Sequence, residues 1–594
     1  MYLVLLETSG NQRYIFATNK LCENIGASEL TYRAGVQWVL EAVHESGGPN
    51  LWHTNPTMRA TNILDPKINR PLESGGFPIE VVLATSGKAI LLVATEELGK
   101  HIITTVTARA LTEAPGLDVC GVVMPFDWEQ DPLGEVLRRI HRKHQEVHAR
   151  LPSPTMRFLR LPIVAACKSS GLPASRAVSE HDIEDLSQAS LAKRGQLDEA
   201  RKWPVNIAID RMETMLDCVN HRIRLPRNLQ KLEEYFDRLE WVAVVHIDGN
   251  GFGRIFHRFD AVIEQDGTAD ETPNRHYIRA LREFSSQLDA CSLQACRTAL
   301  TALAGHRDKV VTVPVVPLIL GGDDVTVLCD GQCALTFARS YLAAFEQETR
   351  AASRTRQVAG RICAGADYLS GTAGISITDP HFPFFTSYEL AEALITKAKT
   401  VKDHLRKDGM AWPCSALDFH VLHDSSVAGL DQIRERLEFE IDTQSGKPTQ
   451  VSLYTRPFVL TELDQLPNGG DGWAAQHHWC HLQQRVGALH AKDPATGERK
   501  LPSSQMHELR AGLHGGPAVA DARYRLIAKR YDLKDLAEDQ GAYPSLFWWS
   551  TTDGTLHAFT RLLDAMTVAN GMFIDTETDV VSVATQAMGG ADEV

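Results

Sequence analysis

The sequence predicts an α+β chain with two βαββαβ units, a mostly helical segment between them and a helical C-terminal domain. Short β-branched runs bounded by Gly-rich turns indicate strands and hairpins, and longer segments between them have the period of helices. The same order of strands and helices occurs twice, as in an internal repeat. A chain of 594 residues is also too long for one hydrophobic core. We therefore expect domains at 1–125, 126–235, 236–425 and 426–594.

The first unit, residues 1–125, has the element order of a ferredoxin-like fold. We expect its strands near 2–7, 79–85, 89–94 and 119–124, and its helices near 28–46 and 96–113. Residues 126–235 are charge-rich and irregular, and they are expected to form a mostly helical linker domain.

The second unit, residues 236–425, repeats this order. We expect a strand at 241–248, helices to about 304, a hairpin at 313–329, a helix at 332–349, a strand near 361–377 and a helix at 386–407. The last helix begins with Thr386-Ser-Tyr-Glu389, which has the spacing of a capping box. Residues 426–594 are expected to be largely helical.

The first strand and turn of each unit match in length and apolar pattern (residues 4–16 and 244–256). In this alignment Thr8 falls opposite Asp248, and Ser86 of the first hairpin falls opposite Asp323 of the second. The first hairpin tip therefore has hydroxyl side chains where the second has carboxylates. We expect one unit that can hold a metal ion and one that cannot.

Three carboxylates of the second unit are expected to share one site. Gly321-Gly-Asp-Asp324 forms a turn between two apolar runs, and Asp248 ends the preceding strand. Neighbouring carboxylates are costly unless a cation neutralises them, and Mg²⁺ prefers oxygen ligands. This pattern is typical of the metal-binding core of palm-type nucleotidyl transferases and nucleotide cyclases. We expect two Mg²⁺ or Mn²⁺ ions, catalytic residues Asp248, Asp323 and Asp324, and Ile247 beside them in the metal site.

The surrounding residues are suited to a nucleotide. The turn Gly249-Asn250-Gly251-Phe252-Gly253 has little side-chain bulk, and its backbone N–H groups can form an anion-binding nest. We assign nucleotide binding to these five residues and to Gly321, Gly322, Lys399 and Ser28. Lys399 is expected to reach a phosphate as a point charge, whereas Lys397 and Lys402 are interpreted as solvated.

The net charge, the length of the apolar runs and the cysteine spacing argue against several classes of protein. The net charge is −14, which argues against sequence-independent nucleic-acid binding over the whole surface. The apolar runs are all shorter than a membrane span, and the acidic Glu7 follows the first apolar run too early for a signal peptide. Eleven scattered cysteines without a Cys-x-x-Cys pair indicate a cytosolic protein without a structural zinc site.

These motifs resemble those of one known family, the large polymerase/cyclase-like subunit of type III CRISPR effector complexes. The resemblance covers both palm domains and the sequence after them. It rests on Gly10–Phe16, Asn24–Leu30, Gly321–Asp324, Ala373–Ile377, Leu390–Lys399 and Ser415–His420. It implies that ATP binds between the palms, with the aspartates of the second palm on the metals. It also implies a cytoplasmic antiviral enzyme that makes 3′–5′ cyclic oligoadenylates, with other effector subunits and guide and target RNA as partners.

The chain departs from that family in three ways. It begins directly on the first palm instead of an HD nuclease domain, so DNase activity is not expected. It lacks a zinc-binding cysteine cluster, and Asn250 stands where many relatives have a second aspartate.

Three alternatives remain open. A stand-alone relative would make a nucleotide signal in anti-phage defence without a guide RNA, and it could be a homo-oligomer. A diguanylate cyclase would prefer glutamate in place of Asp324 and an Arg-x-x-Asp site where Pro314-Val-Val-Pro317 stands. A non-catalytic scaffold, which is a different class of protein, would not need the three aspartates.

Overall fold

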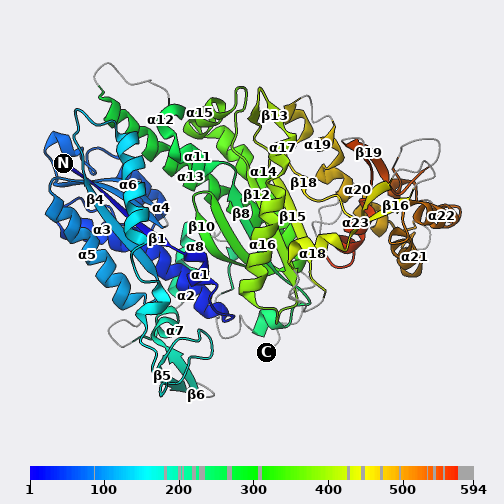
Figure 1. The fold of residues 1–594 in the computed structure, drawn as a ribbon, viewed down its shortest axis with the longest axis horizontal. Coiled ribbons are helices and arrows are strands. Elements are labelled where there is room, and N and C mark those ends of the chain that lie inside the picture. The colour runs from blue at the N-terminus through cyan, green and yellow to red at the C-terminus, as the bar shows by residue number, and fades with distance from the viewer. Residues whose placement is uncertain are drawn as a thin grey trace.

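A computed structural model describes residues 1–85, 87–179, 183–197, 203, 206–216, 222–226, 234–263, 271–304, 311–423, 429–442, 448–467, 472–493, 497–531, 533–538, 544–552 and 555–572. Figure 1 shows the first unit in blue to cyan, the second unit in green at the centre, and the C-terminal region in yellow to red on the far side. Within these ranges, every helix is too short or too polar to cross a lipid bilayer.

The first unit is a four-stranded antiparallel sheet with helices. The strands are β1 (Tyr2–Ser9), β2 (Ile79–Thr85), β3 (Lys88–Val93) and β4 (Asp118–Pro125), in the order β2-β3-β1-β4. The helices are α1 (Asn11–Ile15), α2 (Leu21–Tyr32), α3 (Trp38–Glu45), α4 (Pro56–Leu64) and α5 (Glu96–Glu113), with a 3₁₀ turn at Leu72–Ser74. The predicted ferredoxin-like order is confirmed.

The helix expected at 28–46 starts earlier and is interrupted. A π-helical turn, Arg33–Gln37, separates α2 from α3. A side chain added at Gly35 would lie 2.5 Å from the backbone nitrogen of Gly87, at the tip of the first hairpin. The irregular turn therefore lies where the hairpin packs closely on the helix, a long-range contact that the local sequence does not reveal.

Residues 126–235 are less helical than the sequence predicts. Their described elements are α6 (Leu133–His148), a 3₁₀ turn (Pro154–Arg157), β5 (Ala174–Ser179), β6 (Ile183–Ser187), α7 (Gln188–Lys193), α8 (Asn206–Met215) and β7 (Ile223–Arg224). Strands β5 and β6 form a hairpin, and β7 pairs with β9 (Val311–Thr312) of the next unit. Short polar strands have a weak alternation of apolar residues, which is why the pattern did not predict them.

The second unit has a six-stranded sheet. Its strands are β8 (Val242–Gly249), β10 (Val315–Gly321), β11 (Asp324–Asp330), β12 (Gly371–Thr378), β15 (Ala416–Val421) and β18 (Phe458–Val459), in the order β10-β11-β8-β12-β15-β18. Its helices are α11 (Phe252–His257), α12 (Phe259–Val262), α13 (Pro273–Ala304), α14 (Ala334–Ala351), α15 (Ser353–Ile362), α16 (Phe384–Ala398) and α17 (Val401–His404), with a 3₁₀ turn at Gly331–Cys333. A small ribbon, β13 (Arg406–Lys407) and β14 (Met410–Ala411), follows α17.

Three boundaries in this unit were predicted wrongly. The strand expected near 361–377 is preceded by α15 and starts only at Gly371. Helix α16 starts at Phe384 after Pro383, so the predicted capping box at Thr386 is wrong, because that residue is already helical. The helix expected to reach 407 ends at Ala398 and continues as the short α17.

The two units share more than their strand order. The four strands β10-β11-β8-β12 repeat the arrangement β2-β3-β1-β4, and each first hairpin strand has a β-bulge. The Thr8 amide donates to the Gly87 carbonyl oxygen (2.8 Å), at the position where Asp248 faces Asp324 in the second unit. The predicted repeat of topology is confirmed, while Ser86 lies outside the described residues.

The region after residue 426 is not only helical. It has a mixed four-stranded sheet, β16-β17-β20-β19, made of β16 (Glu438–Asp442), β17 (Pro448–Ser452), β19 (Trp548–Thr552) and β20 (Thr555–Phe559). Its helices are α18 (Leu430–Glu435), α19 (Trp473–Gln476), α20 (Trp479–His490), α21 (Ser503–Leu513), α22 (Pro517–Ala528) and α23 (Leu562–Ala569), with 3₁₀ turns at Leu463–Gln465 and Lys534–Leu536. Strand β18 belongs to the sheet of the second unit. The prediction failed because β17 pairs with a strand far away in the sequence.

Helix α13 joins the two units. Its Arg275 and Arg282 contact the fully buried Glu80 of β2, with N–O distances of 2.5 and 2.6 Å. Burial raises the pKa of Glu80, but the hydrogen bonds and charges of the two arginines outweigh it and lower the pKa below its usual value. One continuous apolar core extends from the first unit to the C-terminal helices.

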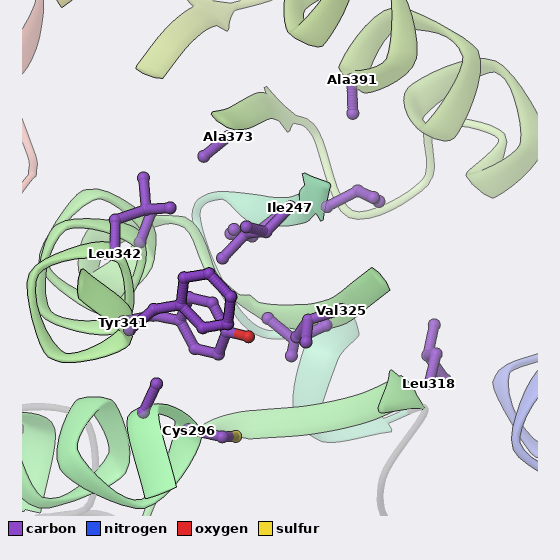
Figure 2. Packing of buried hydrophobic residues seen from close by; sticks show 14 of the residues in the cluster. Ile247, Cys296, Leu318, Val325, Tyr341, Leu342, Ala373 and Ala391 are labelled. Carbon is purple, nitrogen blue, oxygen red and sulfur yellow. The ribbon is translucent and has the colours of Figure 1, made fainter. Parts of the chain in front are cut away.

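Packing in the apolar core determines which side chains of β8 and β11 point into the core and which point away from it. Figure 2 shows Ile247 of β8 and Val325 of β11 pointing toward Tyr341 of α14 and Cys296 of α13. Because side chains alternate along a strand, the neighbours of Ile247 and Val325 point to the other face of the sheet. Ile247, expected in the metal site, directs its side chain into the core, so only its backbone oxygen could contribute a ligand.

Candidate active site

Three aspartates meet where β8 ends and β11 begins. Asp248 and Asp324 are directly opposite each other in the two neighbouring strands, and Asp323 lies in the two-residue turn just before β11. The Gly249 amide donates to the backbone oxygen of Asp323 (3.0 Å), which ties the turn to the end of β8. The structure thus brings together the three aspartates that the sequence singled out.

The turn itself is held by α13. Gly322 has a φ of +60°, a left-handed conformation that favours glycine. Its N–H donates to Oδ1 of Asp289 (2.7 Å), a residue of α13 that the sequence did not single out. The hairpin tip is therefore fixed both by its own backbone and by the helix that joins the two units.

The negative charge of the three aspartates is only partly neutralised by the described residues. Burial, and then the charge of Asp248, raise the pKa of Asp323 to about 6 and that of Asp324 well above its usual value. Asp248 pairs with Lys399, whereas the buried Oδ1 of Asp324 has no hydrogen-bond partner among the described residues. Within that part of the chain, no three acidic, His or Cys side chains are already arranged as a complete metal-ligand set. Repelling carboxylates with an unpartnered oxygen fit a hard divalent cation, which would draw them together.

Lys399 occupies the position that the sequence suggested. It directly follows the last residue of α16, and its Nζ forms an ion pair with Oδ2 of Asp248. Lys397 instead pairs with Asp431 (2.8 Å), and Lys402 is exposed. Of these three lysines, Lys399 is the one that reaches the aspartates, while its contact with a phosphate stays a prediction.

The side chains of two residues in the glycine-rich turn have structural contacts. The Asn250 side chain donates to the Ser370 hydroxyl and the Cys414 backbone oxygen (3.0 Å each) and accepts from the Thr372 hydroxyl (2.7 Å). Phe252 is 1% exposed, so its ring is not available to a nucleotide. The binding of a nucleotide by the backbone N–H groups of this turn stays a prediction.

The glycines of the site have three different roles. A side chain at Gly249 would lie 2.3 Å from the Phe252 ring, so this glycine is required for packing. Gly251 has a φ of +78°, which permits the turn from β8 into α11. Gly253, Gly321 and Gly322 line the cavity beside the aspartates.

A cavity of about 690 Å³ lies between the two units, a volume within the usual range of ligand sites. Its lining residues include Asp323 and Asp324 of the second unit, Lys88 of β3 and Arg138 of α6. Ser28 also lines it, and its hydroxyl donates to the Leu318 backbone oxygen of β10. The structure thus places Ser28 beside the catalytic hairpin, whereas its role toward a nucleotide stays a prediction.

A buried histidine beside the aspartates was not predicted. His246 is 4% exposed, and burial lowers its pKa, so the ring is neutral. Its Nδ1 lies 3.5 Å from Oδ1 of Asp324 and 2.9 Å from the Thr326 hydroxyl. The sequence could have indicated this proximity, because His246 is two residues before Asp248 and residues i and i+2 of a strand lie on the same face.

The repeated sheet and the aspartates on adjacent strands define the central unit as a palm domain. Residues 241–411 match the family described as Cas10/Cmr2, second palm domain. The resemblance predicted from the sequence is confirmed for this unit. No curated protein matches the chain significantly.

Solved structures with a similar arrangement include Csm1 from T. onnurineus, at 12% identity and a TM-score of 0.43, covering 90% of this chain and 64% of that one. They also include a Csm1–Csm4 cassette in complex with cA4, at 13% identity and a TM-score of 0.36, and one in complex with AMPPNP, at 14% and 0.37. Both cassette comparisons cover 67% of this chain and 53% of the other. The chain therefore spans between about half and two-thirds of the length of these proteins.

Proposed function

We propose that this chain is a metal-dependent nucleotidyl cyclase that converts ATP to cyclic oligoadenylates. The observation that carries the proposal is the pairing of Asp248 with Asp324 across two strands, beside Asp323, next to a cavity of about 690 Å³. A scaffold would have no use for three partly buried carboxylates whose mutual repulsion costs stability.

The residues of the second palm have distinct roles in this proposal. Asp248, Asp323 and Asp324 would hold one or two Mg²⁺ or Mn²⁺ ions, which supply charge neutralisation for the reacting phosphate. The ammonium group of Lys399 would then leave Asp248 and pair with a phosphate oxygen of the triphosphate. The glycines at 253, 321 and 322 leave that wall of the cavity free of side chains, so a triphosphate can approach the backbone.

The first palm would bind a second nucleotide without a metal. Thr8 stands where the second palm has Asp248, so the first palm has no carboxylate at that position. Gly10 and Ser28 are small residues of the cavity lining, which also includes Lys88, paired with Glu7, and Arg138 of α6, paired with Asp260. Two nucleotides held from opposite walls would bring a ribose hydroxyl of one near the α-phosphate of the other.

We further propose that the chain acts in the cytoplasm as the large subunit of a type III CRISPR complex. The match to the Cas10/Cmr2 second palm supports this assignment. Two of the solved structures named above are Csm1–Csm4 cassettes, one with cA4 and one with AMPPNP, and we propose a second protein subunit, ATP and a cyclic adenylate as partners of this chain too. Guide and target RNA would act through the assembled complex.

The proposal is tested by incubating the purified chain, alone and with its co-expressed partner proteins and RNA, with ATP and Mg²⁺ or Mn²⁺. Mass spectrometry should detect pyrophosphate and 3′–5′ linked adenylates, and EDTA should abolish both. Products made only from GTP, or turnover that EDTA does not affect, would contradict the proposal.

A further inference from the structure

Asp289 of helix α13 contacts the turn between β10 and β11 from outside the sheet. Its Oδ1 accepts the Gly322 N–H at 2.7 Å, although the two residues are 33 positions apart in the sequence. The ladder of the hairpin ends at the pair of Gly321 and Asp324, so the Gly322 amide lies beyond it. Asp289 therefore supplies the turn with an acceptor that the ladder does not provide.

The turn needs an external support because Asp323 and Asp324 directly follow Gly322. Their carboxylates repel each other and that of Asp248, which favours any rearrangement that moves the three apart. The Gly249 amide already holds the backbone oxygen of Asp323 (3.0 Å). A hydrogen bond to a carboxylate is stronger than one to a neutral acceptor, so the contact with Asp289 is a suitable second support. The backbone around Asp323 is thus held on both sides.

The same helix also holds the first palm. Arg282 is seven residues before Asp289, so the two side chains lie on one face of α13, about 10 Å apart along its axis. Arg282 contacts Glu80 of β2 at 2.6 Å, whereas Asp289 contacts the turn of the second palm. Helix α13 is thus attached to both palms by the same face, and its regular geometry sets the spacing between the two contacts.

We infer that Asp289 is a positioning residue: it holds the Gly322 amide, and α13 thereby places Asp323 and Asp324 for metal binding relative to the first palm. Asp289 lines the same cavity as the two aspartates. Loss of a hydrogen bond that orients a metal site typically weakens metal binding about 10–100-fold. The inference rests on the proposed function, since it takes Asp323 and Asp324 to be metal ligands.

Two variants of nearly equal shape separate the hydrogen bond of Asp289 from its charge. Asp289→Asn loses the negative charge but keeps an acceptor oxygen for the Gly322 amide, whereas Asp289→Leu has neither. Thr298→Ala is the control on the same helix, because this residue is exposed and its hydroxyl donates back to the Gln294 backbone oxygen of α13. Melting curves establish that each variant is folded.

Two measurements are made on the nucleotide-free protein. Electron paramagnetic resonance gives the affinity for Mn²⁺, and mass spectrometry without metal gives the deuterium exchange of the peptide that contains Gly322. Asp289→Leu should bind Mn²⁺ about tenfold more weakly and exchange faster at the turn, because the amide has lost its acceptor. Asp289→Asn should recover most of both properties, and Thr298→Ala should change neither. With ATP, Asp289→Leu should lower kcat with little change in KM.

Unchanged Mn²⁺ affinity or unchanged exchange at the turn in Asp289→Leu would overturn the inference. Equal losses in Asp289→Leu and Asp289→Asn would also overturn it, because they would assign the effect to the charge of Asp289. If Asp289→Leu does not fold, Asp289→Ala decides by the same two comparisons. Failure of the unmodified protein to bind Mn²⁺ or to turn over ATP would contradict the proposed function, whereas exchange at the turn tests the role of Asp289 without either.

Discussion

The ion pair between Lys399 and Asp248 joins a cation to a candidate metal ligand. When a metal binds Asp248, the ammonium group of Lys399 becomes available to a phosphate oxygen nearby. Lysine is suited to this role because it is a compact point charge on a flexible chain. The contact in the structure thus agrees with a role of Lys399 in substrate binding.

Lys399→Ala should raise the KM for ATP by about one to two orders of magnitude and change kcat less. A lost charged hydrogen bond typically costs about 1.5–3 kcal/mol, and about 1.4 kcal/mol corresponds to a tenfold change. Steady-state kinetics measure both constants. The control is Lys397→Ala on the same helix, which removes an exposed pair with Asp431. A larger effect of Lys397→Ala would show that the assignment to Lys399 is wrong.

Glu346 gives a prediction about pH that is independent of the active site. Burial raises its pKa to about 7 from 4.5, against the lowering effect of hydrogen bonds from Ser415 and Thr461. The folded state therefore binds the proton more tightly than the unfolded state, so the stability contributed by protonated Glu346 is present below pH 4.5 and is lost as pH rises through 7. Glu346→Gln keeps an acceptor oxygen but cannot ionise, so this variant should not lose stability as the pH rises through 7.

Compared with the unmodified protein, Glu346→Gln should gain about 3 kcal/mol in free energy of unfolding on going from pH 4.5 to pH 8. Urea denaturation at several pH values measures the difference. A difference that stays the same across this range would contradict the predicted protonation of Glu346.

Some residues of the site could be predicted from the sequence and others could not. Asp248, Asp323 and Asp324 were identified because strand ends and a hairpin turn are local patterns. The structural contacts of the Asn250 and Phe252 side chains were not foreseen, because the same local pattern does not reveal which distant segments they pack against. Asp289 was missed because its contact with the turn crosses from α13, and only the fold brings the two together.

At the scale of helices and strands, the periodicity of apolar residues decided which elements could be predicted from the sequence. The four strands of the first palm, strands β8, β10 and β11 of the second palm and helix α5 lie close to their expected positions, because alternation and amphipathic spacing are strong there. The β5–β6 hairpin was missed because its strands are short and polar, and the C-terminal sheet was missed because β17 pairs with the distant β20. The helical description of residues 126–235 and 426–594 was therefore only partly right.

The contact between helix α13 and strand β2 gives a testable prediction at the scale of elements. Glu80→Gln leaves Arg275 and Arg282 without their buried counter-charge, which should cost about 3–5 kcal/mol of stability. The control Glu73→Gln removes a partly exposed partner of Arg275 and should cost about 1 kcal/mol or less. Urea denaturation of both variants measures the two losses. Equal losses of stability in the two variants would mean that Glu80 does not hold α13 against β2.

At the scale of the whole molecule, two palms of equal topology differ at the hairpin tip. The second palm has the aspartates there, and the first palm contributes Ser28 and Lys88 to the lining of the same cavity. A continuous core and helix α13 hold the two walls together. We therefore propose that one palm holds the metal ions and that the other positions a second nucleotide.

The most direct test of this account compares the unmodified protein with the double variant Asp323→Ala, Asp324→Ala, with Glu389→Ala as the control. Formation of phosphodiester-linked adenylates from labelled ATP is measured with Mg²⁺ or Mn²⁺, under the same conditions and partners for all three proteins. The account predicts product from the unmodified protein and the control, and none from the double variant. The melting temperature of the double variant should change little, because a hairpin tip contributes little to the core. Full activity of the folded double variant would contradict the account.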